Sequence, residues 1–313
     1  MDTSLIVASR RERTAALFRR RRTRKDLLVA ALFLSPAFAF LMTFVYFPTV
    51  LAFLLAFFHY QIGGAGSTWV GVANFRAAAA DAIFRRSLVN TIYFAAMVVP
   101  ATLILATSIA LLIDHAAKFY SFIRVLVLLP YVTPAIGTAI GWMWIYDPTY
   151  GLANAVLHWL HLPVLQWLQS PYLALPSIAI YSLWHGVGFD VVIMLSALHA
   201  LPTGVLEASL VDGATPWRRF WRITLPLISP TMFFLAIVTT AGSLQAFSQV
   251  FALSSATGGP ENSTATALFE VYQTAFTYGN FSYASAMAII LVILILLLTL
   301  FQRWVGKRMV FYQ

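Results

Sequence analysis

The chain contains no cysteine and few charged residues, which make up 10% of its 313 residues. The lack of cysteine excludes a disulfide framework and thiol chemistry. Soluble domains carry about 25% charged residues, so this deficit, together with a 60% hydrophobic composition, argues against a soluble domain. The composition and the long apolar runs indicate a multi-span helical membrane protein. A membrane β-barrel would require short alternating segments, and the sequence shows none.

Sequence motifs for ATP binding, hydrolysis and metal binding are also missing. Gly306-Lys307 lacks the upstream glycine of a phosphate-binding loop and is followed by Arg308, so the chain cannot bind ATP by that route. No His-Glu-x-x-His or Gly-x-Ser-x-Gly motif appears, which argues against an intramembrane enzyme. His158 and His161 are three residues apart, but no nearby Cys or carboxylate completes a zinc site, so we expect no metal.

The formal net charge is +9, and the basic residues are unevenly distributed along the chain, since nine of the 20 Lys and Arg lie between Arg10 and Lys25. This cluster directly precedes the first apolar run, which is typical of a topology signal. No aromatic-interleaved basic fold accompanies it, so we expect no nucleic-acid partner. The segment also resembles a secretory signal that ends at Ala37-Phe38-Ala39. Because the apolar run continues to Phe58, we interpret it as an uncleaved first span.

Six segments are long and apolar enough to span a bilayer, which requires roughly 20 residues. They are 28–57, 88–113, 121–145, 173–198, 227–252 and 284–305. Prolines interrupt the first four, namely Pro36, Pro48, Pro100, Pro130, Pro134 and Pro176. Spanning helices tolerate proline when neighbours satisfy the freed carbonyls, so we expect kinks and not breaks. The predicted fold is an all-α membrane protein with six transmembrane helices, formed by a basic tail (1–26) and a six-span domain (27–313).

The distribution of Lys and Arg between the loops predicts the orientation. Three of the 20 basic residues would lie on one side of the membrane: Arg76, Arg85 and Arg86. The others fall in the N-terminal tail, around loop 113–120, in loop 199–226 and after the last span. Because cytoplasmic loops carry the excess of positive charge, both termini are predicted to be cytoplasmic.

On the other side of the membrane, segment 152–169 is interpreted as a short interfacial helix anchored by Trp159 and Trp167.

A polar stretch at 207–226 separates the fourth and fifth apolar segments. Pro202 can open a short helix that contains Glu207. Asp212-Gly213 can end that helix, because glycine adopts the left-handed conformation at little cost. Thr215 is then a typical N-cap that starts a second short helix.

The second short helix carries aromatic and basic residues. Its aromatic face consists of Trp217, Phe220 and Trp221, and the arginines lie largely on other faces: Arg218, Arg219 and Arg222. Two interpretations remain open on physical grounds. The loop either lies on lipid headgroups through its Trp and Arg, or forms a helix pair that docks on a partner and passes motion to the fourth and fifth spans.

The spacing of this stretch resembles the EAA motif of permeases in ABC importers. Glu207-Ala208-Ser209 is followed after three residues by Gly213, and after nine more by Ile223-Thr224-Leu225-Pro226. The single departure is Ser209, where the family usually has alanine, and serine is also small. Further stretches resemble the carbohydrate-uptake branch, with its maltose-type and glycerol-3-phosphate-type permeases, and the likeness covers roughly 27–313. Examples are Gly151-Leu152-Ala153-Asn154 and Gly258-Gly259-Pro260.

The resemblance implies a permease subunit, without enzymatic activity of its own, that imports a sugar by alternating access. It implies a prokaryotic inner membrane, a second and different permease chain, an extracytoplasmic solute-binding protein, and two ATPase copies that use ATP and Mg. This chain itself would bind no cofactor. By the resemblance to the EAA motif, the ATPase-coupling site in loop 199–226 would consist of Glu207, Ala208, Ser209, Asp212, Gly213, Ile223, Leu225 and Pro226. Glycerol-3-phosphate is the alternative substrate.

Several polar and aromatic residues within the predicted spans are candidates for the substrate path. Asp190 is the only acidic residue well inside a span, and such residues usually face a bundle interior or an aqueous cavity. It either contacts sugar hydroxyls, with Phe189 or Trp184 stacking nearby, or pairs with a neighbouring helix. Gln245 and Gln249 would share a face of the fifth span as path residues or interhelical hydrogen bonds.

Tyr131, near the prolines of the third span, is a further path candidate. A secondary transporter is a more remote alternative. It would predict inverted repeats and several intramembrane charges. We find no repeat and only Asp190.

Overall fold

The computed structural model describes residues 24–60, 66–115 and 120–309, and it contains two compact units, Met1–Leu54 and Leu55–Gln313. In the first unit, α2 (Arg24–Leu41), the π-helical turn η1 (Met42–Tyr46) and α3 (Phe47–Leu55) follow one another without a break. They provide a candidate span at Leu28–Leu55. The basic tail before Arg24 lies outside the described residues.

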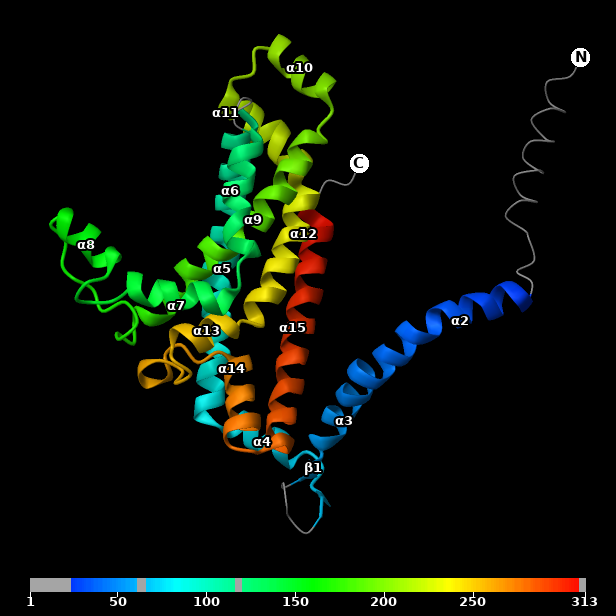
Figure 1. The fold of residues 1–313 in the computed structure, drawn as a ribbon. Helices are drawn as coiled ribbons and strands as arrows, with labels where there is room; N and C mark the ends of the chain where they lie inside the picture. Colours follow the sequence, from blue (N-terminus) through cyan, green and yellow to red (C-terminus); the bar gives the residue numbers. More distant parts are fainter. Residues whose placement is uncertain (1–23, 61–65, 116–119, 310–313) are drawn as a thin grey trace, which may run out of the picture. The chain divides into compact units, whose positions relative to one another are not determined.

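Four long helices form the main body of the second unit (Figure 1). They are α5 (Ala82–His115), α9 (Ala174–His199), α12 (Leu225–Leu244) and α15 (Phe281–Met309). The most extensive packing joins α5 to α9, and α12 packs on both α5 and α15. Small residues such as Ala106 and Ala110 are fully buried against Val191 and Met194, so the backbones of α5 and α9 approach closely.

The third apolar segment is broken, and the prediction of a kink there was wrong. Helix α6 (Tyr120–Val132) and helix α7 (Ala135–Ile145) meet at an angle of 96°. Pro134 has an extended backbone, because its ring and missing N–H prevent the helix from continuing. Five helices are long and apolar enough to cross a membrane, or six if this bent pair forms one span, within the described part of the chain.

Side chains of α9 donate to carbonyl groups at the break in the third segment. The Tyr181 hydroxyl donates to the Ala135 carbonyl at 2.6 Å and lies 2.8 Å from the hydroxyl of Thr138. His185 Nε2 donates to the Thr133 carbonyl at 3.2 Å. A helix break at membrane depth is tolerated when protein groups replace the missing hydrogen bonds in this way.

The fifth apolar segment differs from the prediction at both ends. The helix begins earlier, since α11 (Pro216–Arg219) and the π-helical turn η2 (Phe220–Thr224) continue directly into α12 as one candidate span, Pro216–Leu244. It also ends earlier, because the chain leaves the helix over 245–247 before α13 (Ser248–Leu253). The expected separate second helix of the polar stretch is therefore the first part of a 29-residue span.

Short elements join the long helices of the second unit, and most of them lie toward the end where α5 begins (Figure 1). They comprise the β1–β2 hairpin (Phe58–His59 with Thr68–Trp69), α4 (Ala73–Ala80), α8 (Leu152–Trp159), η3 (Pro260–Asn262), α14 (Ala267–Tyr272) and η4 (Gln273–Thr277). The predicted interfacial helix at 152–169 was too long, because α8 ends at Trp159. Trp159 is 77% exposed, as an anchor would be. Trp167 instead packs inward, where its Nε1 donates to Asn154 Oδ1 at 3.0 Å.

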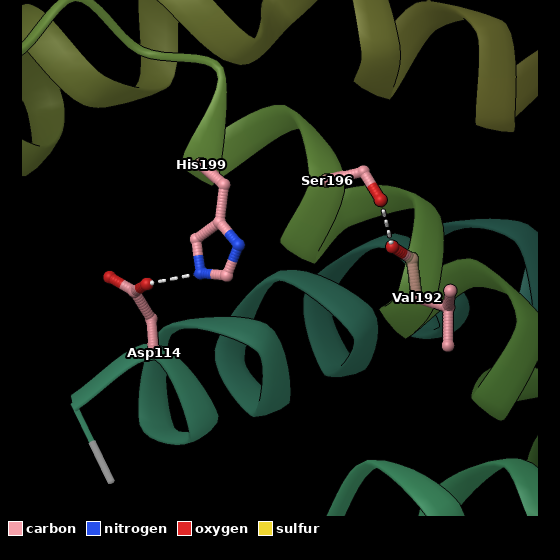
Figure 2. Close-up of polar contacts among 4 residues, drawn as sticks. All are labelled: Asp114, Val192, Ser196 and His199. Atoms are coloured by element: carbon pink, nitrogen blue, oxygen red, sulfur yellow. Dashed lines mark hydrogen bonds and ion pairs between the residues drawn. The ribbon is translucent and has the colours of Figure 1, made fainter. Parts of the chain in front are cut away.

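Helices α5 and α9 end side by side at the opposite end of this unit, near α10 (Thr203–Val211) (Figure 1). Asp114 Oδ1 and His199 Nε2 lie 3.0 Å apart, as Figure 2 shows. In the same view, Ser196 donates to the Val192 carbonyl one helical turn back, at 2.9 Å. The loops that follow the second and fourth predicted spans therefore leave the bundle at the same end, as the charge distribution requires.

Candidate substrate cavity and coupling loop

A cavity of about 360 Å³ lies beside the break in the third segment. Its walls are formed by α5, α6, α7, α9, α12 and α13. Neutral hydrogen-bonding side chains reach it from four of these helices: Thr102, Ser182, Thr239, Ser243, Ser248 and Gln249. Among the described residues that line it, none is Lys or Arg, and Asp190 is the only carboxylate. These groups can bind an uncharged ligand rich in hydroxyls.

Asp190 lies in the wall of this cavity and is 6% exposed. The hydroxyl of Thr239, on α12, donates to Asp190 Oδ1 at 3.4 Å. The two interpretations of Asp190 made from the sequence are therefore compatible, because the carboxyl group joins two helices and also lines the cavity. A buried carboxylate of this kind is expensive in a membrane, and such residues usually mark a pathway.

An aromatic pair forms another part of the cavity wall. The rings of Tyr131 and Phe189 are stacked, with centroids 5.2 Å apart and an interplanar angle of 24°. A sugar ring presents apolar C–H faces that pack on aromatic surfaces of this kind. Tyr131 and Phe189 both lie in the cavity wall, and their role as path residues stays a prediction.

Other path candidates are separated by the fold. Gln249 lines the cavity, whereas Gln245 does not, and its Nε2 donates to the Ala241 carbonyl at 3.0 Å. The expectation that these two glutamines share a helical face was wrong, because α12 ends at Leu244 and α13 begins at Ser248. Trp184 also lies outside the cavity wall and packs on Trp142, with centroids 5.3 Å apart.

His185 lines the cavity and was not among the predicted path residues. A signal for it was present in the sequence. Cavity residues of α9 recur at 182, 185, 186, 189 and 190, which is the spacing of one helical face. His185 lies four residues, about one turn, before the predicted path residue Phe189, whereas Trp184 lies five residues before it and on another face.

The turn at Asp212-Gly213 ends α10 in the predicted way. Gly213 has a φ of +69°, in the left-handed region. The Gly213 amide donates to the Leu210 carbonyl at 3.1 Å, and the Ala214 amide donates to the Ser209 carbonyl at 3.0 Å. These two bonds form a Schellman motif, which fixes the direction in which the chain leaves α10.

The start of the next helix also follows the prediction. The Thr215 side chain accepts from the Arg218 amide at 3.3 Å, with Pro216 in the first helical turn. From there the helix runs unbroken through Ile223, Leu225 and Pro226, all half-buried, into α12. A displacement of the Gly213 turn would therefore act directly on a long helix that lines the cavity.

Helix α10 exposes both charged and apolar side chains. Glu207 and Ala208 are exposed, and Val211 is 89% exposed. Ser209 is buried, and its hydroxyl donates to the Leu206 carbonyl at 2.6 Å, so the extra oxygen relative to alanine is satisfied within the helix. Exposed apolar residues beside a carboxylate are typical of an interaction surface.

The opposite end of the second unit holds an acidic cluster. Asp81 Oδ1 accepts from the amides of Ile83 and Phe84 at 2.8 and 3.3 Å, and caps α5. The Tyr283 hydroxyl donates to Asp81 Oδ2 at 2.8 Å. Burial raises the pKa of Glu270, on α14, and the nearby negative charge of Asp81 raises it further.

Comparisons with known proteins identify the family of this chain. Residues 83–311 match the family model described as binding-protein-dependent transport system inner membrane component. A probable ABC transporter permease protein of Pyrococcus horikoshii is 32% identical over 85% of this chain and 91% of its own length. The sn-glycerol-3-phosphate transport system permease protein UgpA of Agrobacterium fabrum is 30% identical over 89% of this chain and 94% of its own length.

A solved structure shows the same fold. It is a chain of a bacterial ABC transporter involved in the import of the acidic polysaccharide alginate, with a TM-score of 0.78 and 24% identity. The match covers 91% of this chain and 96% of that chain. The fold is thus that of an ABC importer permease, and the chain belongs to the family of inner-membrane permease components of binding-protein-dependent ABC transport systems.

Proposed function

We propose that this permease imports an uncharged sugar or polyol by alternating access, through the cavity around Asp190. The observation that carries this proposal is the composition of the cavity wall. Neutral hydroxyl and amide groups, one carboxylate and a stacked aromatic pair suit a ligand with many hydroxyls.

Glycerol-3-phosphate is the alternative, supported by the similarity to UgpA. A sulfoquinovosyl glycerol transport permease, SmoG of Agrobacterium fabrum, is 29% identical over 85% of this chain. Both names refer to the transport of an anionic compound. In the described wall of this cavity Asp190 would repel a phosphate or sulfonate, and no Lys or Arg offsets it. The wall therefore favours the uncharged substrate.

The energy for transport comes from separate subunits in this proposal. Two cytoplasmic ATPases, which use ATP and Mg, dock on loop 199–226 of this chain and of a second, homologous permease. Glu207, Ala208 and Ser209 on α10 and the Asp212-Gly213 turn form the contact. Ile223, Leu225 and Pro226 transmit the motion, because they belong to the helix that continues into α12. An extracytoplasmic solute-binding protein delivers the substrate at the opposite end.

Uptake by the native host tests the substrate class. A deletion of this chain, and its complementation, would be assayed with labelled disaccharides, oligosaccharides and polyols beside labelled glycerol-3-phosphate. The proposal predicts that uptake of at least one uncharged compound is lost on deletion and restored on complementation. Loss of glycerol-3-phosphate uptake, with uptake of every uncharged compound unchanged, would contradict it.

A further inference from the structure

The basic and aromatic residues of α11 and η2 are not explained by the proposed coupling contact. Trp217 is 73% exposed and Trp221 is 49% exposed, with ring centroids 5.5 Å apart. Arg218 and Arg222 are exposed as well, and neither forms an ion pair within the described residues. Pairs of residues four apart lie on neighbouring turns of a helix. The segment therefore presents two Trp and two Arg side by side to its surroundings.

Arg219 differs from the other two arginines. It lines a cavity of about 570 Å³ between the ends of α5 and α9 and the start of α11. Asp114, which lies 3.0 Å from His199, lines the same cavity as Arg219. Arg218 and Arg222 do not line this cavity, and their charge is available to an external group.

The length of the helix places these residues at the membrane surface. The candidate span Pro216–Leu244 has 29 residues, or about 43 Å of helix. The hydrocarbon core is only about 30 Å thick. Arg222 is also the last charged residue before Glu261, so the apolar part of the helix begins directly after it. The 22 residues from 223 to 244 give about 33 Å of helix, which is enough to cross the core. The first two turns are not needed for the crossing, and their Trp and Arg side chains are typical of the headgroup region.

From these observations we infer that Trp217, Arg218, Trp221 and Arg222 form a binding site for an anionic phospholipid headgroup. The guanidinium groups bind the phosphate, and the Trp rings lie at the boundary between headgroups and acyl chains. Such a site anchors the helix at the point where it leaves the Gly213 turn. Binding of a lipid there would set the depth of α12, which lines the substrate cavity.

The test measures lipid binding to the full chain, purified with its partners in mild detergent and washed free of lipid. Dioleoyl phosphatidylglycerol or dioleoyl phosphatidylcholine would be titrated into the purified protein, and the bound lipid molecules would be counted by native mass spectrometry. The Arg218→Gln/Arg222→Gln variant should bind phosphatidylglycerol about 10- to 30-fold more weakly. The Arg218→Lys/Arg222→Lys variant keeps the charge and should retain most of the preference for phosphatidylglycerol.

A matched control removes the same charge elsewhere. Arg85 and Arg86 are exposed in the first turn of α5, at the other end of the bundle, and the Arg85→Gln/Arg86→Gln variant should bind phosphatidylglycerol as the wild type does. Equal losses in both variants, or no loss in either, would overturn the inference. Displacement of the lipid by equimolar soluble glycerol phosphate would instead indicate a free-phosphate site. Loss of the ATPase subunit with lipid binding intact would make this surface a protein contact.

Discussion

At the residue scale, a substitution of Asp190 tests whether the cavity takes part in transport. Replacement by asparagine keeps the shape and removes the charge. A hydrogen bond to a charged group contributes about 1.5–3 kcal/mol, so Asp190→Asn should weaken the apparent affinity for substrate roughly 10- to 100-fold. Initial rates of uptake over a range of substrate concentrations would measure this.

Two further variants separate binding from packing at Asp190. Thr239→Val removes the interhelical hydrogen bond but leaves the carboxylate, so it should lower the melting temperature. Because Thr239 also lines the cavity, its effect on affinity should be smaller than that of Asp190→Asn, which removes the charge. Gln245→Ala changes a polar residue outside the cavity and should leave uptake unchanged. An Asp190→Asn protein with wild-type affinity and a lowered melting temperature would show that the carboxylate is structural only.

Glu270 provides a prediction about pH at the same scale. Its pKa is raised above the ordinary value of 4.5, mainly by burial and also by Asp81, so folding favours its protonated form. The contribution of this protonated carboxyl group to the stability of the fold is fully present below pH 4.5, and it is lost as the pH rises through the pKa of Glu270 in the folded state. Glu270→Gln should therefore raise the melting temperature at pH 7 to 8, and the gain should vanish below pH 4.5. A gain of the same size at both pH values would contradict this origin.

At the scale of the helices, the positions of the apolar segments were predictable, but where they break was not. Hydropathy does not show which side chains will bind the carbonyl groups at a break. Here the Thr133 carbonyl accepts from His185 and the Ala135 carbonyl from Tyr181, both far away in the sequence. Pro226 was expected at the start of a span, yet the helix passes through it. A π-helical turn precedes it, as another precedes Pro48, which adapts the hydrogen-bond ladder before the proline.

The crossing of α6 and α9 gives a prediction at this scale. A Cβ atom on Gly188 would lie 2.2 Å from the Val127 carbonyl oxygen, a backbone atom that cannot move alone. Gly188→Ala should force α6 away from α9 and cost about 1–3 kcal/mol or more. Thermal unfolding in detergent, followed by size-exclusion fluorescence, would measure the loss.

Gly137, on α7, is the matched control for Gly188. A Cβ atom there meets nothing within 4 Å, so Gly137→Ala should leave the stability unchanged or raise it slightly, since alanine favours a helix over glycine. If Gly188→Ala were as stable as Gly137→Ala, the close packing of α6 on α9 would be wrong.

At the scale of the whole molecule, the long helix that begins at the end of the candidate coupling loop also contributes to the cavity wall. The spacing from Glu207 to Pro226 allowed the loop and its turns to be predicted from the sequence, because Thr215, Pro216 and Gly213 are local signals. The cavity depends on six helices brought together by packing, which is why Trp184 and Gln245 were included and His185 was missed. The helix Pro216–Leu244 runs without a break from the end of the loop to the cavity wall, which is the connection that the proposed coupling requires.

The measurement that tests this account most directly is transport and ATP hydrolysis by the complete importer, purified in mild detergent and reconstituted in vesicles. At Gly213 a side chain meets no neighbour, but the left-handed backbone costs a β-branched residue about 1–2 kcal/mol. Gly213→Val should therefore assemble and insert normally, yet lose about tenfold or more of its substrate uptake per ATP hydrolysed, and Glu207→Ala should lose stimulated hydrolysis. Wild-type uptake and hydrolysis in both variants, or purification without any ATPase, would contradict coupling through this loop.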